Sequence, residues 1–207
     1  MLIFNNVSKS IKGKKIIDNV QLKMENGKVY GLVGRNGSGK TMLLRTIAGL
    51  LRPDEGTVVY NDMTLYKDVD VFPNIGITIE NSGLYPEFTG FKNLKILSSI
   101  NKKIGDGEIR DAITRVGLNP DDKRQVRKYS LGMKQRIVIA QAIMEKPDIL
   151  LLDEPTNGLD EKGVEQIREI ILAEKERGAL VVLASHNKED IEQLADYVYK
   201  VEDGKVN

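Results

Sequence analysis

The segment at residues 34–41 constrains the fold more than any other part of the chain, because it matches the pattern G-x-x-x-x-G-K-[ST]. That pattern has a physical meaning only between a strand and a helix, and it follows directly after Val29–Val33, an apolar run typical of a buried strand. Glycines in such a turn let backbone N–H groups converge on an anion, and the helix predicted to begin near Lys40 adds the positive end of its dipole. The sequence therefore predicts a phosphate-binding loop on an α/β fold.

Two side chains of this loop are expected to make the main contacts to a nucleotide. Lys40 should contact the β- and γ-phosphates, and the hydroxyl of Thr41 should bind Mg²⁺. The loop alone indicates only a nucleotide, because kinases, GTPases, recombinases and transport ATPases all use it. The residues predicted to bind the nucleotide here are Gly34, Arg35, Asn36, Gly37, Ser38, Gly39, Lys40, Thr41 and Met42.

Short apolar runs alternate with helical patterns along the chain, which favours a parallel sheet covered on both faces. Further buried strands are predicted at residues 75–79 and 149–152 and at Leu180–Ala184. Apolar residues recur at helical spacing in two places, with Gly117 as a stop after the first. The two sets are Ile109, Ala112, Ile113 and Val116, and then Val164, Ile167 and Ile171.

Two other parts of the chain depart from this alternation. Residues 1–30 and 57–66, approximately, alternate polar and apolar side chains around glycine-containing turns, which predicts a small antiparallel sheet beside the core. Residues 81–144, approximately, show only helical periodicity and predict a helical insert between two core strands. At 207 residues, with no internal repeat or low-complexity linker, the chain is expected to form one domain spanning residues 1–207.

The composition excludes several classes of protein. Hydrophobic residues make up 41% and charged residues 29%, as in ordinary globular proteins. With 31 basic and 30 acidic side chains the net charge is +1, so no overall attraction to nucleic acid is expected. No cysteine is present, which fits a reducing compartment, and no apolar stretch is long enough to span a bilayer. The expected location is the cytoplasm.

Two carboxylates follow the predicted strand at residues 149–152. Asp153 and Glu154 would lie at the carboxyl end of this strand, where open α/β sheets bind ligands. Asp153 is the expected Mg²⁺ partner, and Glu154, on the other side of the strand, could polarise an attacking water. Such a pair can also serve as a helix cap or a turn carboxylate, but the nearby phosphate loop favours a catalytic role.

Three more polar residues stand at the ends of predicted elements. His186, the only histidine, follows Leu180–Ala184 and so also lies at the carboxyl end of a strand, which favours a functional role over a structural one. Asp160 ends a turn-rich connection, and capping the next helix is its simplest role. Ser130 is likewise a good N-cap for the apolar helix that runs to about Met144.

In their order and approximate spacing, these motifs resemble the nucleotide-binding domain of ABC transporters. The shared features are the phosphate loop, an LSGGQ-like segment at residues 129–133, the Asp153-Glu154 pair, a D-loop at Leu159-Asp160 and the His186 switch. The resemblance covers essentially the whole chain. It implies a P-loop NTPase fold with a RecA-like parallel-sheet core, ATP and Mg²⁺ as ligands, and ATP hydrolysis as the activity.

The resemblance further implies that two ATPase subunits, identical or paired, assemble head to tail around two ATP molecules. Each ATP would lie between the phosphate loop of one subunit and Ser130 and Gly132 of the other, where a helix N-terminus faces the γ-phosphate. Glu154 would act as general base, His186 would hydrogen-bond the γ-phosphate, and Asp160 would communicate between the sites. Separate integral-membrane permease subunits would carry the substrate and hold this chain on the inner face of the cell membrane.

The sequence departs from the family pattern at several positions. Leu131 and Met133 replace a glycine and a glutamine of the signature segment. Ile11 stands where the family places an aromatic residue against adenine, so weaker apolar contact would replace stacking. Glu80 replaces the family's glutamine; its carboxylate can still reach Mg²⁺ through water, but it adds negative charge near the triphosphate. Glu80, Tyr85-Pro86 and the signature segment resemble the bacterial subgroup that exports bacitracin, lantibiotics and similar peptides.

The predicted function is ATP hydrolysis that powers export through separate membrane subunits. An alternative is a soluble ABC-type clamp acting in translation or DNA maintenance, but such proteins usually carry tandem ATPase domains or long coiled-coil insertions, which do not fit in 207 residues. A phosphoryl-transfer kinase would leave the signature segment and the Glu154 base without a purpose.

Overall fold

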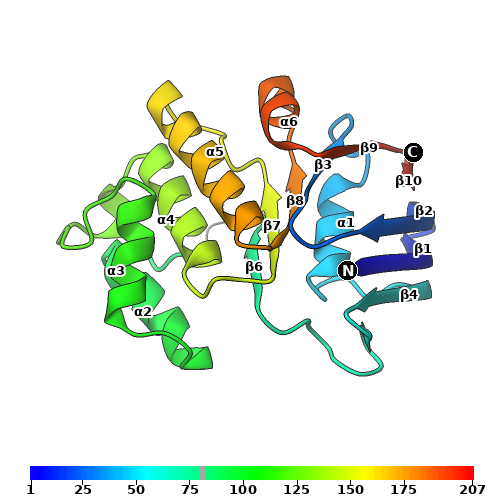
Figure 1. Ribbon diagram of the computed structural model, residues 1–207, viewed down its shortest axis with the longest axis horizontal. Helices are drawn as coiled ribbons and strands as arrows, with labels where there is room; N and C mark the ends of the chain where they lie inside the picture. The colour runs from blue at the N-terminus through cyan, green and yellow to red at the C-terminus, as the bar shows by residue number, and fades with distance from the viewer. Residues whose placement is uncertain (80–82) are drawn as a thin grey trace.

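The computed structural model describes residues 1–79 and 83–207, which form two sheets with helices between and around them (Figure 1). The larger sheet has the strand order β10-β9-β3-β8-β7-β6, and the smaller has the order β2-β1-β4-β5. Helix α1 (Lys40–Ile47) packs against β7 and β8 of the larger sheet and against β2 of the smaller one. Its buried side chains therefore join the two sheets.

The larger sheet is the parallel core that the apolar runs predict. β9, β3, β8, β7 and β6 run parallel to their neighbours, and β10 is antiparallel to β9. Two predicted strands have the same bounds in the structure and two differ by one residue, whereas β9 and β10 were not predicted. The six strands are β3 (Val29–Val33), β6 (Ile75–Thr78), β7 (Ile149–Asp153), β8 (Leu180–Ala184), β9 (Tyr197–Glu202) and β10 (Lys205–Val206).

The smaller sheet is antiparallel, as the alternating polar and apolar residues near the N-terminus predict. β1 (Leu2–Ile11) pairs with β2 (Lys14–Met24) on one side and with β4 (Glu55–Tyr60) on the other, and β5 (Met63–Thr64) pairs with β4. Between β2 and β4 the chain passes through the core sheet, which it enters at Val29. Figure 1 shows this sheet at the end of the molecule opposite the helical insert.

The helical insert lies between β6 and β7 and contains α2 (Gly90–Asn101), α3 (Asp106–Arg115), a 3-10 turn (Val126–Lys128) and α4 (Leu131–Ile143). The predicted apolar positions of α3 are buried, and a φ of +75° at Gly117 follows the end of the helix. Two further helices follow, α5 (Glu161–Glu176) and α6 (Lys188–Leu194).

Two of the predicted helix caps are present. The Ser130 hydroxyl accepts a hydrogen bond from the backbone N–H of Met133 at the start of α4, at 3.2 Å. The carboxylate of Asp160 accepts one from Gly163 at the start of α5, also at 3.2 Å. Both contacts satisfy backbone N–H groups that a helix leaves unpaired at its first turn.

Both faces of the core sheet are buried, which explains why its strands read as continuous apolar runs. Along β7, Ile149 and Leu151 belong to the hydrophobic cluster shared with α1 and the smaller sheet. Leu150 and Leu152 belong to a second cluster, shared with α3, α4, α5 and α6. Because side chains alternate along a strand, β7 delivers successive residues to opposite sides of the sheet.

None of the helices in the described parts of the chain combines the length and the hydropathy that crossing a bilayer requires.

Candidate active site

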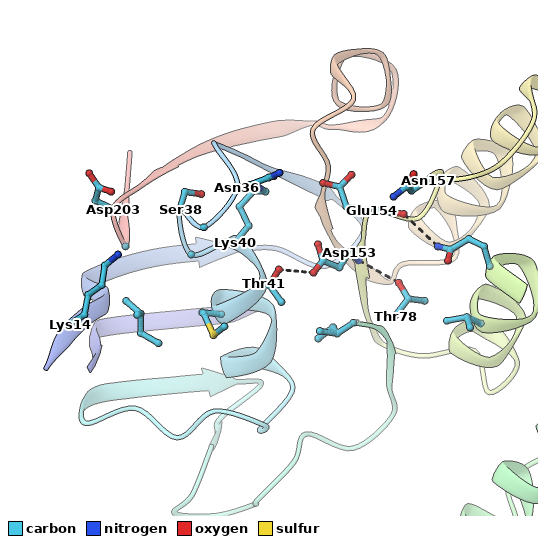
Figure 2. A pocket seen from close by; sticks show the side chains of 18 of the residues that line it. Lys14, Asn36, Ser38, Lys40, Thr41, Thr78, Asp153, Glu154, Asn157 and Asp203 are labelled. Carbon is cyan, nitrogen blue, oxygen red and sulfur yellow. Dashed lines mark hydrogen bonds between the residues drawn. The ribbon is translucent and has the colours of Figure 1, made fainter. Parts of the chain in front are cut away.

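The phosphate loop, residues 34–41, joins β3 to α1 at the carboxyl end of the core sheet (Figure 2). Two of its glycines lie where a side chain would not fit. A Cβ at Gly34 would collide with the carbonyl oxygen of Val201. Gly39 has a φ of +116°, and the Ile16 carbonyl oxygen lies 3.0 Å from the place of its Cβ. The tight path of the loop therefore requires glycine at both positions.

The polar groups of the loop are arranged as an anionic ligand would require. Lys40 Nζ donates to the carbonyl oxygens of Gly34 and Arg35, at 2.8 and 3.3 Å, so the ammonium group lies against the loop. The Ser38 hydroxyl is buried and has no hydrogen-bond partner among the residues that the structure describes. An unpaired buried hydroxyl costs free energy, and a phosphate oxygen would supply the missing acceptor. The loop therefore fits a bound triphosphate.

Thr41 and Asp153 meet beside the loop. The Thr41 hydroxyl donates to Oδ2 of Asp153 at 2.7 Å, and the backbone N–H of Asp153 donates to the Thr78 hydroxyl at 3.3 Å. Hydroxyl and carboxylate oxygens are ligands that Mg²⁺ accepts. Within residues 1–79 and 83–207 no group of three His, Cys, Asp or Glu side chains could hold a metal ion, so phosphate and water would supply the other ligands. The pair fits a metal bound together with a nucleotide.

Glu154 follows Asp153 and has a left-handed backbone conformation, with φ +48°. Its N–H donates to the carbonyl oxygen of Ala184 at 2.8 Å, beyond the last ladder position of β7 and β8. Its carboxylate accepts from the backbone N–H of His186 at 3.1 and 3.3 Å and lies 2.7 Å from the ring Nδ1 of His186. The structure thus places the predicted base and the predicted switch histidine in direct contact.

The turn after Glu154 is supported from the helical insert. Gln135 of α4 donates through Nε2 to the carbonyl oxygens of Glu154 and Pro155, at 3.4 and 3.1 Å. Arg136, the next residue, donates to the carboxylate of Asp160 at 3.3 Å. Helix α4 therefore contacts both ends of the connection between β7 and α5.

The phosphate loop, the two acids Asp153 and Glu154, and Gln135 line a cavity of 860 Å³, which is within the range of small-molecule sites. His186 does not line it. Figure 2 shows Lys14 and Asp203 at one end of the cavity, the phosphate loop in the middle, and Glu154 and Asn157 at the other end. The loop and the first residues of α1, from 36 to 42, all line it. An elongated ligand with its phosphates on the loop would reach both ends.

Ile11, which was expected to face adenine, does not line the cavity. It lies at the end of β1 and is 40% exposed, and the chain reverses direction in the turn that follows it. Ile16 of β2, which that reversal brings back toward the loop, lines the cavity instead. An apolar contact to a base would therefore come from Ile16.

The other predicted site residues fall into three groups. Gly34 and Arg35 place their carbonyl oxygens against Lys40, at the base of the loop. Ser130 and Asp160 are the N-caps of α4 and α5, and Gly132 lies in the first turn of α4; none of the three lines this cavity. Glu80 lies outside the described residues.

Several residues that border the cavity were not predicted. Gln135 lies two residues after the signature segment, and the sequence gave no signal that its amide bonds to the turn after Glu154. Asp203 and Gly204 belong to the hairpin of β9 and β10, and Gly204 donates through its backbone N–H to the Ser38 carbonyl at 2.9 Å. Only the packing of that hairpin on the loop reveals its place in the site.

Comparisons with known proteins indicate the same family as the motifs. The family model described as ABC transporter matches residues 17–157. The uncharacterized ABC transporter ATP-binding protein YybJ of Bacillus subtilis (strain 168) is 50% identical over 201 residues, which cover 97% of this chain and 92% of that protein. The lantibiotic transport ATP-binding protein SrtF of Streptococcus pyogenes is 35% identical over 206 residues, which cover 100% of this chain and 89% of that protein.

The fold has a close match among solved structures. The dimeric structure of the ATP-binding cassette MJ0796, in a post-hydrolysis state bound to ADP and Pi, has a TM-score of 0.89 at 26% identity, covering 100% of this chain and 97% of that chain. This match confirms the predicted P-loop NTPase fold, and the match to SrtF confirms the resemblance to the lantibiotic-type subgroup. The chain belongs to the ABC transporter family as an ATP-binding protein.

Proposed function

We propose that this chain hydrolyses Mg-ATP in a pair of ATPase subunits that closes around two nucleotides and drives separate integral-membrane subunits. The observation that carries the proposal is the single cavity that Lys40, Thr41, Asp153 and Glu154 all line. An anion-binding loop, a metal-binding pair and a carboxylate beside the reacting end are the parts that phosphoryl transfer to water requires.

Within this cavity each side chain has a distinct task. Lys40 binds the β- and γ-phosphates, and Glu154 acts as the general base that orients and deprotonates water. His186, held against Glu154, hydrogen-bonds the γ-phosphate. Thr41 and Asp153 hold Mg²⁺, which when bound neutralises charge on the phosphate oxygens.

The pairing of subunits follows from the position of the signature segment. Ser130 is exposed at the N-terminus of α4 and does not line the cavity of its own chain. A helix N-terminus with free N–H groups attracts anions, so α4 would face the γ-phosphate held by a second subunit. The dimeric arrangement of the MJ0796 cassette supports this reading. The second subunit is either another copy of this chain or a related ATPase.

The transported substance is proposed from the relatives. SrtF is named a lantibiotic transport ATP-binding protein, and its match runs the length of this chain. We therefore place the chain at the inner face of the cell membrane, bound to a permease that exports a peptide of this kind. Glu80, Tyr85-Pro86 and the signature segment favour the same subgroup.

The comparisons support the transport function and not the soluble clamp, and one experiment tests the transport function against the clamp. Purification of the chain from membranes of its source cell, followed by identification of the attached proteins, should yield an integral-membrane subunit. A complex free of membrane protein as the sole cellular form would contradict the transport function.

Glu154→Gln tests the mechanism itself. The substitution keeps the shape of the side chain and removes the base, so ATP hydrolysis should fall by about 10²- to 10³-fold while Mg-ATP still binds. Because the nucleotide then stays intact, light scattering should detect a dimer at saturating Mg-ATP.

The matched control is Glu169→Gln, at an exposed position of α5. It should leave unchanged both the rate of ATP hydrolysis and the molecular mass that light scattering gives for the wild-type chain. Full turnover by Glu154→Gln would remove Glu154 as the base, and a monomer at saturating Mg-ATP would contradict the paired site.

A further inference from the structure

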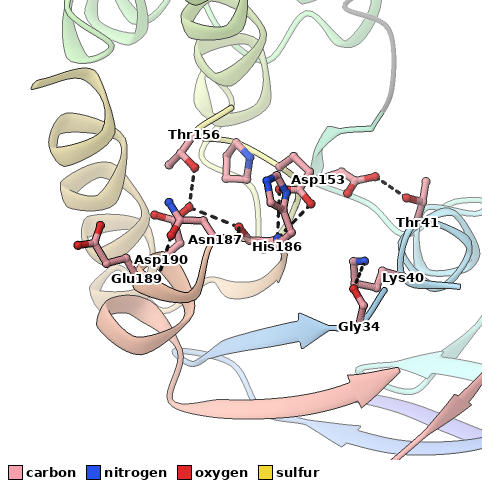
Figure 3. A network of polar contacts seen from close by, with 12 residues as sticks. Gly34, Lys40, Thr41, Asp153, Thr156, His186, Asn187, Glu189 and Asp190 are labelled. Atoms are coloured by element: carbon pink, nitrogen blue, oxygen red, sulfur yellow. Dashed lines mark hydrogen bonds and ion pairs between the residues drawn. The ribbon is translucent and has the colours of Figure 1, made fainter. Parts of the chain in front are cut away.

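A buried carboxylate connects the segment that carries Thr156 with the segment that carries His186 (Figure 3). Asp190, in the first turn of α6, has no exposed surface. It accepts hydrogen bonds from the Thr156 hydroxyl at 2.5 Å and from the Ser185 hydroxyl at 3.4 Å. Arg168 of α5 contacts the other carboxylate oxygen, through Nε at 2.8 Å and a terminal nitrogen at 2.7 Å. Asp190 therefore joins three separate segments of the chain.

Both hydroxyl donors are close neighbours of the proposed catalytic groups. Thr156 lies two residues after Glu154, and Ser185 directly precedes His186. The Ser185 hydroxyl also accepts from the backbone N–H of Asn187 at 3.0 Å, on the far side of His186. A residue with the positive φ of Glu154 persists only where surrounding contacts determine its conformation. The bonds to Asp190 supply such contacts to both segments.

Arg168 is the cationic partner of the buried Asp190 carboxylate. Its side chain is 10% exposed, and it also contacts Glu189 at 3.1 Å and Gln193 at 3.0 Å. Burial by itself lowers the pKa of the Arg168 guanidinium, but the hydrogen bonds to Asp190 and Glu189 outweigh burial and raise that pKa. Both groups of the pair are therefore satisfied, as a buried ion pair requires.

Helix stability alone does not account for this arrangement. An acid in the first turn stabilises a helix through its dipole, but exposed Glu189 occupies the first turn of α6 as well. A buried ion pair is also often no more stabilising than apolar side chains of similar volume. Apolar side chains could not accept hydrogen bonds from the Thr156 and Ser185 hydroxyls, which lie close to the catalytic groups.

We propose that Asp190 is a positioning residue for ATP hydrolysis, which keeps Glu154 and His186 in contact through the hydroxyls of its two partners. The inference rests on the proposed function, because it treats Glu154 and His186 as groups that act on ATP. Asp190 does not line the cavity and acts only through its neighbours. Its loss should therefore slow the chemical step more than it weakens nucleotide binding.

Thr156→Val tests the link most directly, because valine keeps the shape of threonine and removes the hydroxyl. We expect kcat to fall about tenfold, the effect of losing a hydrogen bond to a charged group, while the affinity for Mg-ATP changes less than about twofold. Thr156→Ser restores the hydroxyl and should recover most of kcat. Both parameters come from steady-state ATP hydrolysis and from equilibrium nucleotide binding.

The control is Thr46→Val, the same substitution at another buried threonine, whose hydroxyl donates to the Met42 carbonyl at 2.8 Å. This variant should keep the kcat of the wild-type chain. Thermal unfolding of each variant shows whether it remains folded at the assay temperature, so a change in kcat can be assigned to folded protein.

Asp190→Asn completes the test as a double-mutant cycle. If Thr156 acts through Asp190, then Thr156→Val should lower kcat much less in the Asp190→Asn variant than in the wild-type chain. Should Asp190→Asn fail to fold, the Thr156 variants decide alone.

Three outcomes would overturn the positioning role of Asp190. They are an equal loss of kcat and nucleotide affinity in Thr156→Val, an unchanged kcat in Thr156→Val, and no recovery of kcat in Thr156→Ser. The proposed function fails separately, when Glu154→Gln turns over like wild type. An active wild-type chain with an inactive Glu154→Gln and an unaffected Thr156→Val would remove only the role of Asp190.

Discussion

The phosphate loop and the acidic side of the site are built in different ways. The phosphate loop consists of the consecutive residues 34–41, and its shape depends on backbone conformation at glycine. The acidic edge, which we define as Asp153, Glu154, Thr156, His186 and Asp190, is joined by side-chain hydrogen bonds between residues 32 and 34 positions apart. The first is a local conformation, and the second is an assembly of distant segments.

This difference implies different sensitivities to mutation. A loop made of closely packed backbone cannot accept an added atom where glycine is required. A network of side chains instead loses one hydrogen bond at a time, and the remaining bonds limit the damage. An added Cβ should therefore have the larger effect in the loop, and a deleted hydroxyl the smaller effect at the acidic edge.

Gly34→Ala should have the largest effect. The new Cβ would collide with the carbonyl oxygen of Val201, which is backbone and cannot swing away, so the loop must move. We expect the affinity for Mg-ATP to fall at least about 100-fold, on the scale of a severe backbone clash. Isothermal titration calorimetry of the variant with Mg-ATP measures this affinity.

Gly178→Ala is the matched control, because Gly178 also has a positive φ, +99°, but its Cβ would meet open space. It should reduce the free energy of unfolding by roughly 1–2 kcal/mol through left-handed strain and leave nucleotide affinity unchanged. Equal affinities for Gly34→Ala and Gly178→Ala would show that the loop is not limited by backbone packing.

Thr41→Val should have an intermediate effect, because it acts where the two regions meet. It removes the hydroxyl that donates to Asp153 and that we assign to Mg²⁺. The Mg²⁺ concentration for half-maximal ATP hydrolysis should rise about tenfold or more, as when a metal site loses a ligand or its partner. Thr41→Ser, which keeps the hydroxyl, should behave like wild type, and an unchanged Mg²⁺ requirement in Thr41→Val would contradict the assignment.

Ser130→Ala should have the smallest effect on the isolated chain. Loss of the N-cap of α4 should lower the free energy of unfolding by about 1 kcal/mol, measured by urea denaturation. Nucleotide binding by the monomer should not change, because Ser130 does not line the cavity.

Thr89→Ala provides the comparison, because Thr89 caps α2 in the same manner, accepting from Lys92 at 3.2 Å. Both variants should lose similar stability. When each is combined with Glu154→Gln, only Ser130→Ala should weaken the dimer formed with Mg-ATP. If the two double variants dimerise equally, Ser130 serves only as the N-cap of α4.

The local parts of the site could be predicted because their physics is contained in a few consecutive residues. The strands Val29–Val33 and Leu180–Ala184 have the predicted bounds, since burial on both faces leaves an uninterrupted apolar run. Ser130 caps α4 as expected, since a serine before an apolar helix pattern satisfies backbone N–H groups three residues on.

The long-range parts could not be predicted, because they depend on how distant elements pack. Ile11 was expected near the base, but the turn after β1 brings Ile16 to the cavity instead. The hairpin of β9 and β10 reaches the phosphate loop through a bond from Gly204 to Ser38, and neither strand showed a clear period in the sequence. Glu80 lies outside the described residues, so its expected role stays a prediction.

The sequence alone indicates the candidate groups of the site and their order, because the phosphate loop, the acids at the end of β7 and the histidine after β8 are each placed by their own strand. Which groups support them depends on how distant elements pack. No sequence pattern around Asp190 indicates its role. That role depends on the hydroxyls and the guanidinium that the packing of α5 and α6 brings to its carboxylate.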